Sequence, residues 1–421
     1  MLNILLDPSK QMEMSSYRSD KCTVVRNCLT CDSENLVVVY DLGACPLTDN
    51  YISNKEESLN AEAFPLVVCL CKDCGNLQLR YQVSPQLSYG TYHYNSKITL
   101  GLDKEFLSYA NQLILSATDP SDITVLDVGS NDGSFLLACK ENKINAYGIE
   151  PSSTQAASAN ALGLPTLATY FDENTSSIIE HNKIFPKIYD FITFNNVLAN
   201  LPDPISSLRY AVQLLRPQTG QIVIQSGYHP LQFRRGLFDW TYHEHFSYFS
   251  LKSLTKLASQ LDMQVQSFQT MPLRGGSFRA MLGFDDSKQP INYEHFTEVE
   301  SFIGLRKFIN SSREYLHELL LNYHNRGFNI IGFGASHSTG VLVHAFGIKS
   351  YLSCLLDDND SKHGLYMPGT SLLVKSPQSE LTKDADLRLV IVVLAWQYYD
   401  VIVNRLRNLG FRGPIICPVL L

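Results

Sequence analysis

Apolar runs of strand length alternate with amphipathic helical stretches over residues 120–285 of this chain. The alternation predicts βαβ units on a mainly parallel sheet, with strands near 123–128, 145–149, 189–197 and 221–226. It resumes over residues 328–421 with four further apolar runs. Between these regions, residues 294–326 have helical spacing up to Gly327 and predict a long connecting helix. The pattern therefore indicates an α/β protein with two sheets.

Length and composition limit the class of protein. A chain of 421 residues is too long for a single ordinary core, so we expect two or three domains. Hydrophobic residues make up 45% of the chain and charged residues 18%, which excludes a disordered or fibrous protein. The net charge is -7 and no basic run compensates for it, so a nucleic-acid partner is not expected.

Neither the first residues nor the longest apolar stretch has the pattern of a secreted or a membrane protein. The first residues, MLNILLDPSK, lack the basic start and the long apolar segment of a secretory leader. The longest apolar stretch, 387–396, contains Arg388 and is far shorter than the roughly 20 residues that span a bilayer. We therefore expect a cytoplasmic protein with no membrane partner, whose ten cysteines stay reduced unless a metal holds them.

Seven of the ten cysteines fall in a segment of short β-rich runs near the N-terminus. Four of them form two Cys-x-x-Cys pairs, Cys28 with Cys31 and Cys71 with Cys74. Each pair can fold as a knuckle with both sulfurs facing one point, and four thiolates satisfy tetrahedral zinc without leaving a position for water. The sequence predicts a structural zinc site, in which Cys69 competes with Cys71 for one ligand position.

The strand near 123–128 leads through a loop of small and polar residues into a helix. Small residues let the backbone approach a ligand closely, with the helix N-terminus behind it. Glu150 ends the next strand, where a carboxylate can accept hydrogen bonds from ribose hydroxyls. The loop lacks the Gly-x-Gly-x-x-Gly spacing of a dinucleotide site. We therefore predict S-adenosylmethionine rather than NAD, bound by Glu150 together with Asp127, Gly129, Ser130, Asn131, Asp132 and Gly133.

Two later strands bring further polar residues to the same edge of the sheet. One ends at Asn195 and Asn196, which are additional cofactor-binding candidates because ligands collect at the carboxyl ends of the strands. The other is followed by the segment 242–245, Tyr-His-Glu-His. Removing a proton next to a ketone requires a base of near-neutral pKa and a donor to the enolate oxygen, and histidine and tyrosine suit these roles. The offset of the two histidines disfavours protease-type zinc binding, and a polar loop cap is the alternative.

Two more segments are candidates for substrate binding. Tyr92 and Tyr94 share one face if their aromatic run is extended, and they either line a pocket or pack as an interdomain linker. A second glycine loop, 332–340, again follows a strand, and Asp357 ends the next one. This loop is either a backbone cradle for a diphosphate or a structural copy of the first loop. Its candidate ligand-binding residues are Gly334, Ala335, Ser336 and Asp357.

Motifs along nearly the whole chain resemble those of one known family. They are the two cysteine pairs, Leu42-Gly43 with Pro46-Leu47, 74–79, 127–133, 242–245, Gly275-Gly276-Ser277 with Arg279, 332–335, 357–370 and Ala395-Trp396. In this order and spacing they resemble the zinc-containing sugar C-methyltransferases, which act on C3 of nucleotide-linked 4-keto-deoxysugars. The resemblance implies a zinc-binding domain over 20–85, a Rossmann-like S-adenosylmethionine-dependent methyltransferase domain over 86–290, and a C-terminal Rossmann-like domain over 291–421 that binds the substrate nucleotide.

The resemblance also implies roles for individual residues. His245 is expected to be the base that removes the C3 proton, with Glu244 and Tyr242 beside it. The enolate formed next to the C4 ketone then takes the methyl group. A tyrosine of the Tyr92–Tyr94 run is expected to reach the sugar, and Arg279 to contribute to substrate binding. Such an enzyme is expected to be a monomer or a dimer.

Two departures from the family pattern affect these expectations. Asn200 stands where relatives carry a histidine, so it keeps hydrogen-bonding capacity without a proton-shuttling role near neutral pH. Ser338 stands where a lysine is common, which weakens the case for a phosphate grip in the second glycine loop. The alternatives are O- or N-methylation of a related small molecule, or a non-catalytic zinc- and nucleotide-binding protein.

Overall fold

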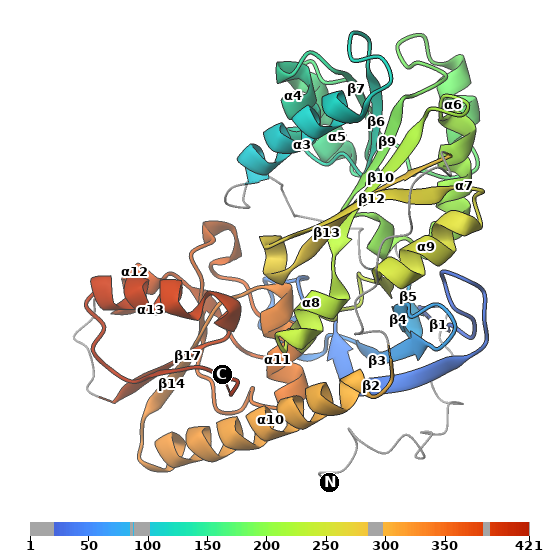
Figure 1. The fold of residues 1–421 in the computed structure, drawn as a ribbon. Coiled ribbons are helices and arrows are strands. Elements are labelled where there is room, and N and C mark those ends of the chain that lie inside the picture. Colours follow the sequence, from blue (N-terminus) through green and yellow to red (C-terminus); the bar gives the residue numbers. More distant parts are fainter. Residues whose placement is uncertain (1–20, 85–86, 88–101, 285–297, 382–387, 421) are drawn as a thin grey trace.

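The computed structural model describes residues 21–84, 87, 102–284, 298–381 and 388–420. Within them the strands form one two-stranded pair and sheets of seven, five and four strands (Figure 1). The predicted α/β architecture is confirmed: a large mixed sheet with helices on both faces, a small N-terminal sheet that carries the cysteine pairs, and a parallel C-terminal sheet. No helix in these ranges is both long and apolar enough to cross a membrane.

The seven-stranded sheet contains the strands expected from the hydrophobic pattern. β13 runs antiparallel to both of its neighbours, and all the other pairs are parallel. The strands predicted near 123–128, 145–149, 189–197 and 221–226 are confirmed, the third with narrower bounds. Across the sheet the order is β12 (Gln264–Met271), β13 (Ser277–Gly283), β10 (Gln221–Gly227), β9 (Phe191–Asn195), β6 (Thr124–Val128), β7 (Asn145–Ile149) and β8 (Thr166–Leu167).

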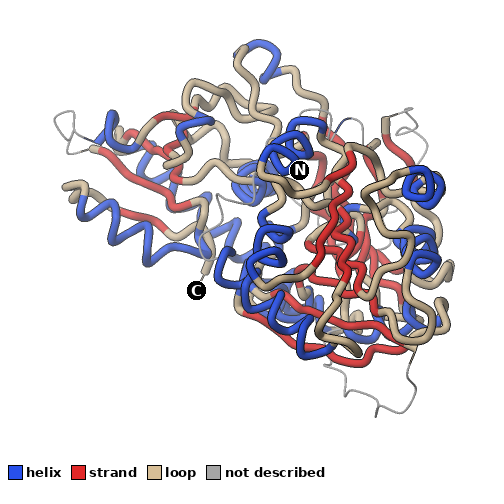
Figure 2. Tube along the Cα trace, turned by 90° about the horizontal axis from the view of Figure 1, so that it is seen from above, coloured by secondary structure: helices blue, strands red, loops and turns tan. Residues whose placement is uncertain are grey.

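Helices cover both faces of this sheet, as its apolar strands require. Figure 2 shows the strands lying between layers of helix. Successive side chains point to opposite faces, so Ile222 and Ile224 of β10 belong to one buried cluster and Val223 to another. The helices around the sheet are α3 (Leu102–Ser116), α4 (Ser134–Glu141), α5 (Ser153–Ala161), α6 (Thr175–His181), α7 (Pro204–Leu214), α8 (His229–Arg234) and α9 (Leu251–Ser259).

The C-terminal sheet is entirely parallel. Its order is β16 (Val374–Lys375), β15 (Leu355–Leu356), β14 (Asn329–Phe333), β17 (Leu389–Val393) and β18 (Ile415–Ile416). The helices of this region are α10 (Ser301–Asn325), α11 (His337–Phe346), α12 (Pro377–Leu381) and α13 (Tyr399–Asn408). The long connecting helix is thus confirmed as α10, although it begins at Ser301 and not near residue 294, since residues 298–300 form a bend and turn.

The N-terminal sheet is antiparallel and recruits a strand from the middle of the chain. Its order is β11 (Ser247–Tyr248), β4 (Leu77–Leu79), β3 (Ala63–Cys71) and β2 (Leu36–Pro46). The pair β1 (Cys22–Val24) and β5 (Tyr81–Val83) lies alongside, and α1 (Lys55–Leu59) precedes β3. Because β11 directly follows the Tyr-His-Glu-His segment, that segment is fixed between the large sheet and the N-terminal sheet.

One hydrophobic core joins the N-terminal sheet to the C-terminal sheet. The buried face of α10 places Phe302, Leu305 and Ile309 at helical spacing against residues of β2 and β14. Arg306 of the same helix donates to the Val39 carbonyl of β2, at 3.1 Å. In Figure 1, α10 runs from the β14 side of the molecule to β2. The shared core fixes the loops of these two regions relative to each other.

Candidate functional site

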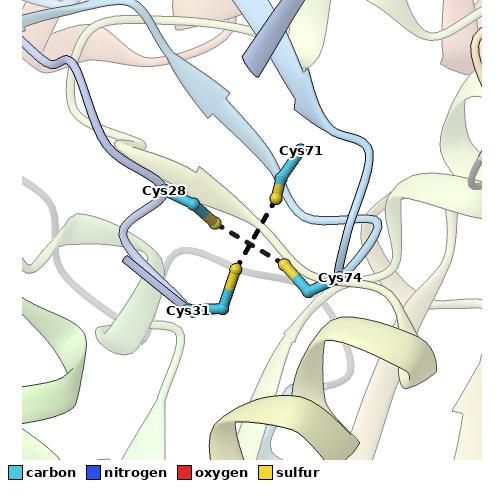
Figure 3. Close-up of side chains that lie close together, drawn as sticks. All are labelled: Cys28, Cys31, Cys71 and Cys74. Atoms are coloured by element: carbon cyan, nitrogen blue, oxygen red, sulfur yellow. Dashed lines mark hydrogen bonds between the residues drawn. The ribbon is translucent and has the colours of Figure 1, made fainter. Parts of the chain in front are cut away.

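The four paired cysteines form one compact cluster (Figure 3). The Sγ atoms of Cys28 and Cys74 lie 3.5 Å apart, those of Cys31 and Cys71 lie 3.6 Å apart, and all four lie within 4.8 Å of one another. Tetrahedral zinc with Zn–S bonds of about 2.3 Å separates its sulfurs by about 3.8 Å, so the donor set fits this ion. The cluster contains Cys71 and not Cys69.

A backbone hydrogen bond shapes the second knuckle, and two side-chain hydrogen bonds connect the cluster to the rest of the protein. The Gly75 N–H donates to the Cys71 carbonyl at 2.8 Å, and φ of Gly75 is +71°, a left-handed value that favours glycine. Gln260, at the end of α9, donates to the Thr30 carbonyl at 2.6 Å, and Ser250 donates to the Gly75 carbonyl at 3.2 Å. The cluster is therefore attached to a helix of the large sheet.

The first glycine loop turns sharply after β6 and leaves polar atoms facing its interior. Gly129 has φ +72°, and a Cβ there would lie 2.3 Å from a methyl of Val197. The Glu150 carboxylate accepts hydrogen bonds from the N–H of Asn131 at 2.9 Å and of Ser152 at 2.8 Å. Burial raises the pKa of Glu150. The predicted carboxylate therefore lies against the loop and holds its turn.

Asp127 lies below this loop and is almost fully buried. One of its carboxylate oxygens accepts hydrogen bonds from Thr193 Oγ1 at 2.6 Å and from Asn195 Nδ2 at 2.9 Å. Burial raises the pKa of Asp127 to about 7. Asn196, next to Asn195, adopts a left-handed φ of +58°, and such values gather at functional sites.

Several buried polar atoms around this loop have no hydrogen-bond partner among the described residues. They are Ser130 Oγ, Asp132 Oδ2 and Asn195 Oδ1. Buried polar groups are normally satisfied, so orphaned atoms at the carboxyl ends of parallel strands indicate a bound polar ligand. Gly129, Gly133 and Glu150 border the same place, and the set therefore fits a nucleoside-containing cofactor.

The Tyr-His-Glu-His segment contains two histidines in different surroundings. His243 is fully buried and its Nε2 lies 3.2 Å from the Phe64 carbonyl of β3, and burial lowers its pKa to about 4. His245 is half-buried, and its Nε2 lies 3.2 Å from the Tyr242 hydroxyl. Burial raises the pKa of Glu244. The structure thus gives His243 a packing role and leaves His245 as the histidine paired with a tyrosine.

Asn200 lies next to this segment. It is the last residue of the 3₁₀ helix η2 (Leu198–Asn200), whose Ala199 carbonyl accepts a hydrogen bond from the Phe246 N–H at 2.7 Å. Its buried Oδ1 has no partner within the part of the chain that the structure describes. The predicted catalytic residues Asn200, Tyr242, Glu244 and His245 are thereby brought together.

The second glycine loop approaches the same segment from the C-terminal sheet. Gly334 has φ +115°, and the Ala335 N–H donates to Asp357 at 2.6 Å. Ser336 caps α11, so that His337 begins the helix and its ring lies 4.7 Å from the Tyr242 ring, centroid to centroid. The second glycine loop and the loop after β9 therefore both lie near the Tyr242–His245 pair.

Comparison with known proteins agrees with this arrangement. Three family models match successive parts of the chain: a zinc binding domain over residues 28–89, a methyltransferase domain over 104–267 and a C-methyltransferase C-terminal domain over 272–419. The C-methyltransferase NovU of Streptomyces niveus is 26% identical over 94% of this chain and 96% of its own length. This chain is an S-adenosylmethionine-dependent methyltransferase that resembles C-methyltransferases over most of its length.

Other similar proteins match smaller shares of the chain. The ubiquinone biosynthesis O-methyltransferase of Yersinia enterocolitica is 31% identical over 23% of this chain and 39% of its own length. Among solved structures, the plantazolicin methyltransferase BpumL in complex with SAH is 16% identical, with a TM-score of 0.33, over 43% of this chain and 84% of that chain. The mitomycin 7-O-methyltransferase MmcR is 14% identical, with a TM-score of 0.33, over 47% of this chain and 62% of that chain.

The cofactors of this methyltransferase are S-adenosylmethionine and zinc. The cysteine cluster has the composition and spacing of a structural zinc site, with no ligand position left for water. The loop between β6 and α4 has the orphaned polar atoms and the close backbone approach that a nucleoside cofactor requires. The assignment of individual cofactor-binding residues and the limits of the three domains stay predictions.

Not every predicted site residue joins the group. Tyr92 and Tyr94 lie outside the described residues. Arg279 of β13 is buried within the protein, where its guanidinium contacts the carboxylate of Glu105, donates to Gln225 at 3.0 Å and stacks over the Tyr109 ring at 3.6 Å. The structure therefore gives Arg279 internal partners and does not place it with the second glycine loop.

Sequence reasoning did not single out several residues that the structure places at this site. Asp239 is fully buried, accepts a hydrogen bond from Trp396 Nε1 at 2.8 Å, and has a pKa raised by burial to about 7. Asp49 and Lys362 form an ion pair of 2.6 Å beside His337. His337 lay inside the second glycine loop and Lys362 inside the motif 357–370, so the positions of these two residues were the available signals.

Proposed function

We propose that this methyltransferase transfers a methyl group to C3 of a nucleotide-linked 4-keto-6-deoxysugar by way of an enolate. The observation that carries the proposal is the contact of 3.2 Å between His245 and Tyr242, in the place where loops of the large sheet and of the C-terminal sheet converge. The motif resemblance to sugar C-methyltransferases and the match to NovU over almost the whole chain support the choice of reaction.

The proposed roles follow from the chemistry of a carbon acid. His245 removes the C3 proton, because imidazole is the side chain that most often serves as a general base. The Tyr242 hydroxyl donates a hydrogen bond toward the oxygen at C4, which gains charge as the enolate forms. Glu244 is buried beside them and its raised pKa lets it hold a proton at higher pH than an exposed glutamate does. Asn200 contributes a hydrogen bond and no proton transfer.

The cofactor would be held by the first glycine loop and its neighbours. We assign Glu150 to the ribose hydroxyls, and Asn195 and Asn196 to the edge of the site that faces the substrate. The remaining assigned residues are Asp127, Gly129, Ser130, Asn131, Asp132 and Gly133. Bound S-adenosylmethionine supplies the electrophilic methyl group, and the protein's own contribution is to orient the sugar and to hold and move the C3 proton.

The nucleotide of the substrate is assigned to the C-terminal region. The backbone at Gly334 and Ala335, the Ser336 hydroxyl and the Asp357 carboxylate form the loop end that faces the Tyr242 segment. Tyr92 and Tyr94 complete the proposed set of substrate-contacting residues. The proposed setting is the cytoplasm, where thiolate zinc ligands stay reduced.

The experiment that tests this function is an incubation with a nucleotide-linked 4-keto-6-deoxysugar in deuterated buffer, with and without S-adenosylmethionine. Gain of one methyl on carbon, or deuterium wash-in at C3 without the methyl donor, is the expected result. His245→Gln should lower both by about 10²–10⁴-fold. His324→Ala, an exposed histidine on α10, is the matched control and should leave both rates unchanged. Methyl transfer to oxygen or nitrogen would overturn the proposal.

A further inference from the structure

Tyr242 contacts a histidine on each of two elements. Its ring lies 4.2 Å from the His245 ring and 4.7 Å from the His337 ring, with interplanar angles of 37° and 33°. His245 belongs to the same segment, whereas His337 begins α11 of the C-terminal sheet. A ring held on a neighbouring domain therefore packs on the tyrosine that binds the proposed base.

His337 is in turn fixed by a residue of the N-terminal region. Its Nδ1 lies 3.8 Å from Oδ2 of Asp49, and the other oxygen of that carboxylate accepts a hydrogen bond from Lys362 at 2.6 Å. Lys362 also donates to the Ala335 carbonyl in the second glycine loop, at 2.6 Å. His337 and Asp49 are each about a quarter exposed, so their attraction is partly screened. The value of the contact therefore lies in geometry more than in energy.

We propose that Asp49 and His337 act together as positioning residues, which hold the Tyr242 ring and thereby orient the His245 imidazole. Asp49 is contributed by the N-terminal region, His337 by the C-terminal region and Tyr242 by the middle of the chain, so the orientation depends on all three parts being assembled. The catalytic consequence rests on the proposed role of His245 as a base. The coupling itself is a property of the free protein and is independent of any substrate.

The coupling is tested first in the free enzyme, by NMR of protein labelled at histidine Cε1. The His245 resonance is assigned by its loss in His245→Gln. We expect His337→Ala and Asp49→Ala both to shift that resonance, and His324→Ala to leave it in place. An unchanged His245 resonance in both variants would overturn the proposal.

A second variant separates the aromatic contact from the link to Asp49. His337→Phe keeps a ring against Tyr242 and cannot pair with the carboxylate, so it should shift the His245 resonance less than His337→Ala does. It also serves as the test variant if His337→Ala does not fold. A His245 resonance identical to that of the unmodified protein in His337→Phe would then count against a role for Asp49.

Kinetics with the proposed sugar provide the second readout. His337→Ala and Asp49→Ala should lower kcat by about 10–100-fold and change KM by less than about threefold, because a misplaced reacting group slows chemistry more than binding. The double variant should be no slower than the slower single variant, since the two residues act as one unit. If the losses of kcat in the two single variants multiplied in the double variant, Asp49 and His337 would not act as one unit. If the unmodified enzyme does not convert the sugar, the proposed function fails, while the NMR result still decides this inference.

Discussion

The large sheet and the C-terminal sheet of this enzyme share one arrangement of parallel strands in different surroundings. In both, five parallel strands follow the same order, with the third, second, first, fourth and fifth strands side by side. In both, a glycine loop follows the first strand and an acidic residue ends the second. The carboxylate accepts a loop N–H in each case, Glu150 from Asn131 at 2.9 Å and Asp357 from Ala335 at 2.6 Å.

The difference lies in what else contacts each loop. Beside the first loop, Ser130 Oγ, Asp132 Oδ2 and Asn195 Oδ1 have no partner among the described residues. At the second loop, Lys362 donates to the Ala335 carbonyl, and a Cβ on Gly340 would lie 2.6 Å from Thr48. The same turn thus leaves buried polar atoms without protein partners in one sheet, whereas in the other it also packs against the N-terminal region. Strand order and glycine spacing alone do not distinguish these uses.

The largest expected effect is the loss of stability when zinc is removed. The two sheets should lose stability unequally, because the cysteine cluster is attached to them unequally. Gln260 and Ser250 attach it to α9 over the large sheet, whereas α11 contacts the far end of the N-terminal sheet. Chelation should cost at least about 5 kcal/mol of stability. By hydrogen exchange, α9 and β12 should lose protection before the C-terminal sheet does. Equal loss of hydrogen-exchange protection in both sheets would contradict this prediction. A zinc content well under one ion per chain in untreated protein would contradict it as well.

The second effect distinguishes Glu150 from Asp357, the acidic residues that end the second strand of each sheet, by their influence on S-adenosylmethionine binding. Glu150→Ala should weaken S-adenosylmethionine binding about 100-fold, because both the proposed ribose acceptor and the support for the Asn131 N–H are lost. Asp357→Ala breaks the equivalent bond in the other sheet and should change that affinity less than about twofold. Isothermal titration calorimetry measures both, and an equal weakening by the two variants would remove the distinction drawn between the loops.

The third effect tests how closely the first loop is packed. Gly129→Ala adds a Cβ at a backbone φ of +72°, only 2.3 Å from a methyl of Val197. The substitution should therefore destabilise the protein by about 2–3 kcal/mol in denaturant titration. Gly347→Ala is the matched control, since its φ is +65° with no atom within 4 Å, and should cost about 1 kcal/mol. Adding Val197→Ala should recover part of the loss in Gly129→Ala and none in Gly347→Ala.

The smallest effect is a dependence of stability on pH. Burial raises the pKa of Asp127 to about 7, so the folded protein keeps a proton there that the unfolded chain releases near pH 4. Stability from this group is therefore complete at low pH and is lost as the pH rises to about 7. Asp127→Asn should be more stable than the unmodified enzyme at pH 8, because an amide has no charge to bury. Its single amide oxygen can keep both hydrogen bonds, from Thr193 and Asn195.

The stability gain in Asp127→Asn should disappear as the pH is lowered toward 4, where the aspartate is protonated in both states. Denaturant titration at several pH values measures it. A stability gain that is the same at every pH would show that the carboxylate does not change its protonation on unfolding. Burial of its charge would then not be the cause of the gain.

Local sequence patterns determined the elements and most of the chemistry of this protein. Apolar alternation located β6, β7, β9, β10 and α10, because strand and helix periodicity are properties of a few consecutive residues. Paired cysteine spacing predicted the cluster that Figure 3 shows, since each knuckle is a local turn. The glycine loop with Glu150, and the Tyr242–His245 segment, were likewise visible as short motifs.

Tertiary structure alone decided which of these residues meet and which histidine is structural. His243 and His245 are two positions apart, yet only packing of the segment on the N-terminal sheet joins His243 to Phe64 and leaves His245 against Tyr242. Arg279 belonged to a recognised motif, but its neighbours Glu105 and Tyr109 come from α3, far away in sequence. The meeting of Asp49 with His337 depends on the shared core that joins two sheets, and no local pattern encodes contacts over such separations.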